Sequence, residues 1–214
     1  MKSDYNVLIV GLVILLLCVS GCASPAPPAA PVPQSSPGQP ATSQPAPDST
    51  VSTIEPAEMA LQLSDVPAGF TIHEKWERTR SDVRQSALDR GWKKGYHVMF
   101  RRQNESTLQV EYLTQDIDIY LTDNVNQVLA KGNTEILQGS EDTYEVIQLP
   151  DPKIGDSSQA YDVKLIKRSN RVLASGLFIQ FVKKDVYEQI VMVSMSQDYK
   201  ALTEIADTAA GKII

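Results

Sequence analysis

Cysteine and histidine are scarce in this 214-residue chain, which contains two of each. Both cysteines, Cys18 and Cys22, lie near the N-terminus, so the rest of the chain has no thiol with which to form a disulfide. His73 and His97 are the only candidates for a neutral-pH base or a nitrogen ligand to a metal. The chain also lacks a Gly-x-Ser-x-Gly elbow, a P-loop and a glycine-rich dinucleotide fingerprint. Without a catalytic motif, we expect neither an enzyme nor a bound cofactor or metal.

Long apolar runs are scarce as well. One run, from Val7 to Val19, is about 13 residues long, which is short for a membrane span of about 20 residues. Small residues follow it, and Val19-Ser20-Gly21-Cys22 resembles the lipobox of prokaryotic (bacterial and archaeal) lipoproteins. The resemblance implies a signal peptide over residues 1–21, a diacylglyceryl group on Cys22 and a place on the extracytoplasmic face of the cell membrane. An uncleaved N-terminal anchor helix is the alternative.

A proline-rich segment follows the proposed lipidation site. Residues 23–50 contain nine prolines, separated mainly by Ala, Ser, Gln and Thr, and a single charge at Asp48. Such a composition buries too little apolar surface to offset the entropy lost on ordering. We therefore predict a disordered linker over residues 22–53 and a single globular domain over residues 54–214, long enough for a core of its own.

Hydrophobic periodicity within this domain alternates between the strand and helix periods. It predicts helices over 55–63, from 122 or 123, and from 196 or 198. It predicts strands over 70–79, 95–102, 108–121, 144–149, 159–167, 172–183 and 186–195. The fold class is α+β, an α/β/α layer sandwich with a mostly antiparallel sheet. This order of elements resembles the PsbP/Mog1-like group of folds. The resemblance implies a binding or assembly-support module, and no family site residue can be carried over.

The segment from Leu108 to Leu121 is irregular in its pattern. Val110 and Tyr112 share one parity, whereas Leu113, Ile117 and Ile119 share the other. A regular strand with one buried face cannot bury both sets, so we expect a break or bulge near residues 114–115.

Parity also suggests where the polar side chains of the strands lie. His73 and His97 occupy positions that alternate with apolar residues, which predicts solvent-facing histidines. Asp116 and Asp118 flank Ile117 and project from one face about 7 Å apart, as on a half-exposed strand. A catalytic carboxylate pair and a cation site are the alternatives for these aspartates. Core packing is the expectation for both tryptophans and for the scattered methionines, namely Trp76, Trp92, Met99, Met192 and Met195.

Charge is distributed unevenly along the chain. Residues 73–102 carry nine Lys or Arg against four acids, whereas residues 104–162 carry two Lys against twelve acids. The basic region predicts a face that binds an anionic ligand or a partner, unless its charges intermix with acids on the folded surface. The candidate residues of this face are Arg78, Arg80, Arg84, Lys93, Lys94, Arg101 and Arg102. The net charge of −6 argues against nucleic acid as a partner. Asn104 begins an Asn-Glu-Ser glycosylation acceptor in a predicted turn.

These patterns together predict a lipid-anchored extracytoplasmic binding or assembly-support module. Its partner would be an extracytoplasmic protein or an anionic surface ligand, besides the membrane that holds its anchor. A solute-binding lipoprotein and a surface hydrolase are the alternatives. The hydrolase would need a pocket that gathers His73 or His97 with Asp116 and Asp118.

Overall fold

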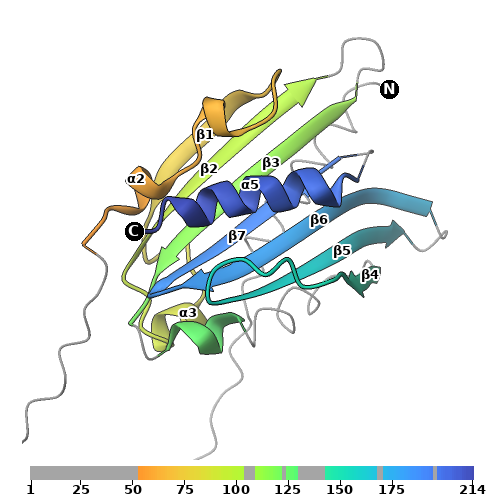
Figure 1. The fold of residues 1–214 in the computed structure, drawn as a ribbon. Helices are drawn as coiled ribbons and strands as arrows, with labels where there is room; N and C mark the ends of the chain where they lie inside the picture. The colour runs from red at the N-terminus through yellow and green to blue at the C-terminus, as the bar shows by residue number, and fades with distance from the viewer. Residues whose placement is uncertain (1–52, 104–108, 122–123, 130–142, 168–170, 195–196) are drawn as a thin grey trace, which may run out of the picture.

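The computed structural model describes residues 53–103, 109–121, 124–129, 143–167, 171–194 and 197–214. Cys22, the proline-rich linker and Asn104 lie outside this part of the chain. The described residues build one seven-stranded sheet in the order β1-β2-β3-β7-β6-β5-β4, and every neighbouring pair is antiparallel (Figure 1). The strands are β1 (Thr71–Arg78), β2 (Lys94–Gln103), β3 (Val110–Ile119), β4 (Thr143–Gln148), β5 (Ser157–Lys167), β6 (Arg171–Lys183) and β7 (Val186–Val193).

One face of the sheet is covered by the C-terminal helix α5 (Tyr199–Gly211), which runs across the strands in Figure 1. The side chain of Asp198 caps the helix by accepting a hydrogen bond from the backbone N–H of Ala201. The apolar stripe of α5 packs into a core with the sheet and with the short helix α2 (Pro56–Met59). The buried stripe consists of Leu202, Ile205, Ala206, Ala209 and Ala210.

Helical segments also cover one end of the opposite face. Helix α3 (Gln85–Asp89) and the helical residues 125–129 pack there with Trp92, Tyr120 and Tyr187 in a separate apolar cluster. The mixed α+β class with an antiparallel sheet is thus confirmed. Among the helices of the described ranges, none is both long and apolar enough to cross a membrane.

The predicted break in the third strand is wrong. β3 keeps a regular register with both neighbours from Tyr112 to Ile119, and residues 112–119 are buried at both parities. The physical reason is that both faces of this central strand are covered, so it needs no bulge to bury two sets of side chains. Register shifts occur elsewhere, between Ile72 and Glu74 in β1 and between Leu165 and Ile166 in β5.

The other strands agree with the sequence pattern to within a few residues, and so does the terminal helix. The first predicted helix is shorter than expected. α2 ends at Met59, and a 3-10 turn, η1 (Leu63–Asp65), follows after an extended stretch. Leu61, within that stretch, donates its backbone N–H to the side chain of Gln115 on β3, which places this segment against the sheet.

Candidate functional site: a polar row across the sheet

Six side chains with hydrogen-bonding groups are register partners across six strands, and we call them the polar row. They are Trp76 (β1), His97 (β2), Asp116 (β3), Gln189 (β7), Gln180 (β6) and Gln159 (β5). Next to these residues in their strands, Val98, Ile117 and Ile190 belong to the core beneath α5. Because successive side chains of a strand point to opposite faces, the polar row lies on the face away from α5.

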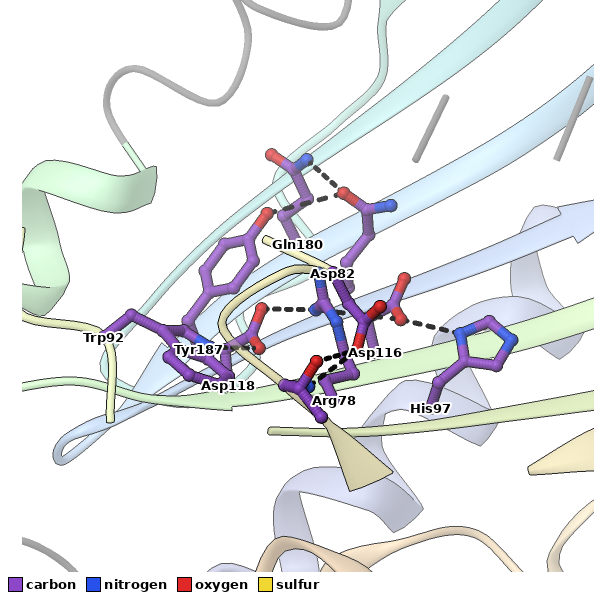
Figure 2. A network of polar contacts seen from close by, with 10 residues as sticks. Arg78, Asp82, Trp92, His97, Asp116, Asp118, Gln180 and Tyr187 are labelled. Atoms are coloured by element: carbon purple, nitrogen blue, oxygen red, sulfur yellow. Dashed lines mark hydrogen bonds and ion pairs between the residues drawn. The ribbon is translucent and has the colours of Figure 1, made fainter. Parts of the chain in front are cut away.

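His97 and Asp116 form the centre of the row. His97 is fully buried, and its Nδ1 lies 2.7 Å from Oδ1 of Asp116 (Figure 2). Burial disfavours the charged form of Asp116, but the Arg78 guanidinium and the hydrogen bond from His97 outweigh it and lower the pKa of this carboxyl. An ionised carboxylate only accepts hydrogen bonds, which assigns the hydrogen to Nδ1 of His97. Nε2 of the same ring is buried and has no hydrogen-bond partner.

Arg78 connects this pair to a second carboxylate. Its guanidinium donates to Oδ2 of Asp118 at 2.6 Å and lies 3.8 Å from Oδ1 of Asp116. The indole N–H of Trp92 donates to the other oxygen of Asp118 at 2.7 Å, as Figure 2 shows. Burial, with the Asp116 charge adding to it, raises the pKa of Asp118 despite these bonds. The result is a buried ionic cluster held by three strands and by the loop that carries Trp92.

Gly95 makes this cluster sterically feasible. It lies on β2, between its register partners Arg78 on β1 and Asp118 on β3. A Cβ at this position would be 2.3 Å from Oδ1 of Asp118 and 2.7 Å from the carbonyl oxygen of Ile117. The missing side chain therefore leaves the space through which Arg78 reaches across a whole strand.

Trp76 forms the exposed end of the row. Its ring stacks on the imidazole of His97, with centroids 4.0 Å apart and an interplanar angle of 27°. The residue is 38% exposed, whereas Trp92 is buried at 7%. The expectation of core packing is thus confirmed for Trp92 and wrong for Trp76, because β1 is the edge strand of the sheet and leaves one side of the ring uncovered.

Three glutamines continue the row across β7, β6 and β5. Gln180 donates from Nε2 to Oε1 of Gln189 at 3.0 Å, and Tyr161 donates to Oε1 of Gln159 at 2.9 Å. Gln180 is 1% exposed, and its Oε1 is buried without a partner. Two polar atoms of the row, Nε2 of His97 and Oε1 of Gln180, are therefore both buried and without a hydrogen-bond partner.

Two expectations about these strands need correction. His97 was expected at the surface, and Asp116 and Asp118 on a half-exposed strand. All three are buried, because the face away from α5 is covered here too. His73 is exposed as predicted, and its ring makes a T-shaped contact with Tyr112, with the centroids 6.2 Å apart. In the part of the chain that the structure describes, no group of three or more acidic, His or Cys side chains is arranged to hold a metal ion.

The predicted basic face is only partly a surface of uncompensated charge. Arg78 belongs to the buried cluster, Lys94 pairs with Glu55 at 2.8 Å, and Arg102 donates to Glu111 at 2.6 Å. Arg101 donates to Gln103, and its Nε is buried without a partner. Arg84 is half-buried and also has a polar interaction of its own, whereas Arg80 and Lys93 are exposed. Anion binding at these residues stays a prediction.

A second buried polar group lies on the α5 face. Glu188 on β7 is fully buried; its Oε2 accepts from Gln115 at 2.8 Å, and its Oε1 has no partner. Gln115 in turn accepts from the backbone N–H of Leu61 at 2.8 Å. Burial raises the pKa of Glu188 to about 8, although the Gln115 bond and the Lys212 charge act in the opposite direction.

Sequence reasoning missed Arg78 as a partner of the aspartates, and it missed Gly95 and the three glutamines of the row. Arg78 was grouped with surface cations because its neighbours in the sequence are basic. A signal was present for the aspartates. Ile190 to Val193 on β7 are apolar at both parities, which indicates a sheet covered on both faces, and polar residues of a strand beside β7 then have to be buried.

No family model and no curated protein matches the chain. The solved structure of the extracellular domain of PknH from Mycobacterium tuberculosis is similar in fold, with a TM-score of 0.55. The superposition covers 73% of this chain and 93% of that chain, at 8% sequence identity. At this identity the likeness concerns the arrangement of helices and strands alone.

Proposed function

We propose that the protein is a lipid-anchored binding module on the extracytoplasmic face of the cell membrane. In this proposal Cys22 carries the lipid, residues 22–53 are the tether, and residues 54–214 form the binding domain, with a fold of the PsbP/Mog1-like group. The observation that carries the binding role is the buried polar row that ends at the exposed ring of Trp76.

Such a row is costly for stability alone. Burying an arginine and two carboxylates removes three charged groups from water, and apolar side chains of similar size often give an equally or more stable core. Titratable groups in buried, perturbed surroundings concentrate at functional sites. The unpaired atoms of His97 and Gln180 add a further cost that a ligand would relieve. These features favour a recognition surface over a purely structural cluster.

The anchor follows from the sequence motif. A diacylglyceryl group buries two acyl chains, at about 0.8 kcal/mol per methylene, which suffices for stable attachment. A proline-rich tether would then separate the domain from the lipid surface. Partners within reach are an extracytoplasmic protein or a ligand in the surrounding medium.

A surface hydrolase is the less favoured reading. The His97–Asp116 pair has the form of a base with its orienting carboxylate. The described contacts place no hydroxyl or thiol nucleophile at Nε2 of His97, which a hydrolase of this type requires.

The test of this proposal compares the wild-type chain with Cys22→Ala in the native host. We expect the wild-type protein in the membrane fraction, with the intact mass of a chain that starts at Cys22 and carries a diacylglyceryl group. Protease added to spheroplasts should degrade it. Cys22→Ala should lack the lipid mass. A wild-type protein with the mass of the uncut chain, or one protected from external protease, would contradict the proposal.

A further inference from the structure

The polar row has the chemistry of a carbohydrate site. We propose that it binds an oligosaccharide, with sugar hydroxyls donating to Nε2 of His97 and Oε1 of Gln180 and one sugar ring stacked on Trp76. This inference rests on the proposed binding function and names its class of ligand.

The two unpaired atoms require hydrogen-bond donors. Nδ1 of His97 donates to Asp116, and in the neutral imidazole with this tautomer Nε2 is an acceptor. Gln180 uses its amide N–H on Gln189, which leaves its carbonyl oxygen as the free acceptor. Both side chains are more than nine-tenths buried and lie on the same face of the sheet. A ligand that binds to both atoms must carry at least two hydrogen-bond donors.

The spacing of the acceptors indicates an extended ligand. β2 and β6 are separated by β3 and β7, so their register partners lie about 14 Å apart at the usual spacing of strands. An oligosaccharide presents hydroxyl donors repeatedly over such a length. The intervening residues of the row, Asp116 and Gln189, are likewise acceptors or amides that suit hydroxyl groups.

The exposed ring supplies the second element of carbohydrate recognition. Trp76 rests on His97 with one face of its indole and is 38% exposed. An aromatic face attracts the slightly positive C–H groups of a sugar ring, because its quadrupole is negative at the face. Trp76 also covers His97, so the proposal includes a movement of the Trp76 side chain that uncovers Nε2 of His97.

The charges around the polar row favour a neutral ligand over an ionic one. Both carboxylates already have a cation beside them, because the Arg78 guanidinium lies 2.6 Å from Asp118 and 3.8 Å from Asp116. Oε1 of Gln180 is a neutral acceptor on β6, which β7 separates from the strand that carries both aspartates. A polyhydroxylated neutral ligand satisfies both ends of the row without adding a buried charge.

The experiment is calorimetric titration of the purified lipoprotein in a sugar-free zwitterionic detergent. The probes are the trisaccharides maltotriose, cellotriose, mannotriose and chitotriose. For a trisaccharide that binds, we expect Trp76→Ala to weaken the affinity about tenfold and Gln180→Leu about fivefold. Ile147→Ala is the matched control, since Ile147 is an exposed apolar residue on β4 at the far edge of the sheet, and it should change the affinity less than twofold.

The outcomes separate this inference from the function on which it rests. Binding that Trp76→Ala and Gln180→Leu both weaken supports the carbohydrate site. Binding that neither variant weakens overturns it, as does no binding of any trisaccharide. In those cases a thermal-shift screen with amines, carboxylates and phosphate esters follows. A compound that stabilises the wild type against heat but does not stabilise Trp76→Ala would overturn the proposal of a carbohydrate ligand. The same result would support the proposed binding function of the domain. A screen without such a compound removes the binding role of the row as well.

Discussion

Replacing Glu188 by glutamine tests the electrostatics of the core beneath α5. Glu188→Gln keeps the shape of a protonated glutamate and removes its ability to ionise. The carboxyl is fully buried, one of its oxygens has no partner, and burial raises its pKa to about 8. We therefore expect this variant to be more stable than the wild type in mildly alkaline solution and similar to it in acid.

The direction follows from proton linkage. Because the pKa is higher in the folded chain than in the unfolded chain, the folded state binds more protons between about pH 4.5 and pH 8. The contribution of Glu188 is therefore most favourable below about pH 4.5 and declines as the pH rises through this window. Above about pH 8 both states are ionised, and the contribution stops changing.

The magnitude follows from the size of the shift. A pKa raised from 4.5 to about 8, at 1.36 kcal/mol per unit, corresponds to a loss of about 5 kcal/mol across the window. This is of the order of the whole unfolding free energy of a marginal domain, about 5–15 kcal/mol. Local opening of the fold that lets water reach the Glu188 carboxylate would reduce this loss of stability.

The assay is urea unfolding of the wild type and the variant at pH 5, 6, 7, 8 and 9. Other titrating groups contribute to both proteins, so the difference in unfolding free energy isolates Glu188. The difference in unfolding free energy between Glu188→Gln and the wild type should be no more than about 1 kcal/mol at pH 5, and it should grow to several kcal/mol at pH 9. Glu77→Gln, at an exposed site on β1, is the matched control and should follow the wild type throughout. A difference that is the same at pH 5 and pH 9 would refute the reasoning.

Two further predictions concern the buried ionic cluster. Gly95→Ala places a Cβ 2.3 Å from Oδ1 of Asp118, so we expect a loss of about 3 kcal/mol in urea unfolding and a changed Trp92 fluorescence, with Gly211→Ala, where a Cβ meets nothing within 4 Å, as the control. Arg78→Met leaves the buried carboxylates without their cation and should cost about 3 kcal/mol or more at pH 7. Adding Asp118→Asn to Arg78→Met should recover part of that loss, and strictly additive losses would contradict the coupling.

The helices and strands can be predicted from the sequence, whereas the pairing register of the strands cannot. Strands and the terminal helix are predicted well because alternation and the 3.6-residue stripe are local properties. The polar row is not local. Trp76, His97 and Asp116 become neighbours through pairing between strands, and Gln189 joins them from the other end of the domain. No spacing within the sequence encodes this arrangement.

The errors at β3 and at His97 share one cause. Each of these predictions assumed that a strand of this sheet has one buried face and one solvent-exposed face. The central strands are buried at both parities, so parity assigns a side chain to a face and no longer to solvent. Trp76 shows the converse, since an apolar residue on an edge strand remains partly exposed.

The order of the strands has a consequence for how the chain folds. β1, β2 and β3 pair with their neighbours in sequence, and so do β4, β5, β6 and β7, so each group is able to form as a local meander. The two meanders join only where β3 meets β7, between residues far apart in the chain. Pairing β3 with β7 costs most of the loop-closure entropy. We therefore expect this pairing to be the rate-limiting step of folding. Asp116 and Gln189 face each other across this pair of strands, so the polar row is completed only when the two halves of the sheet have docked.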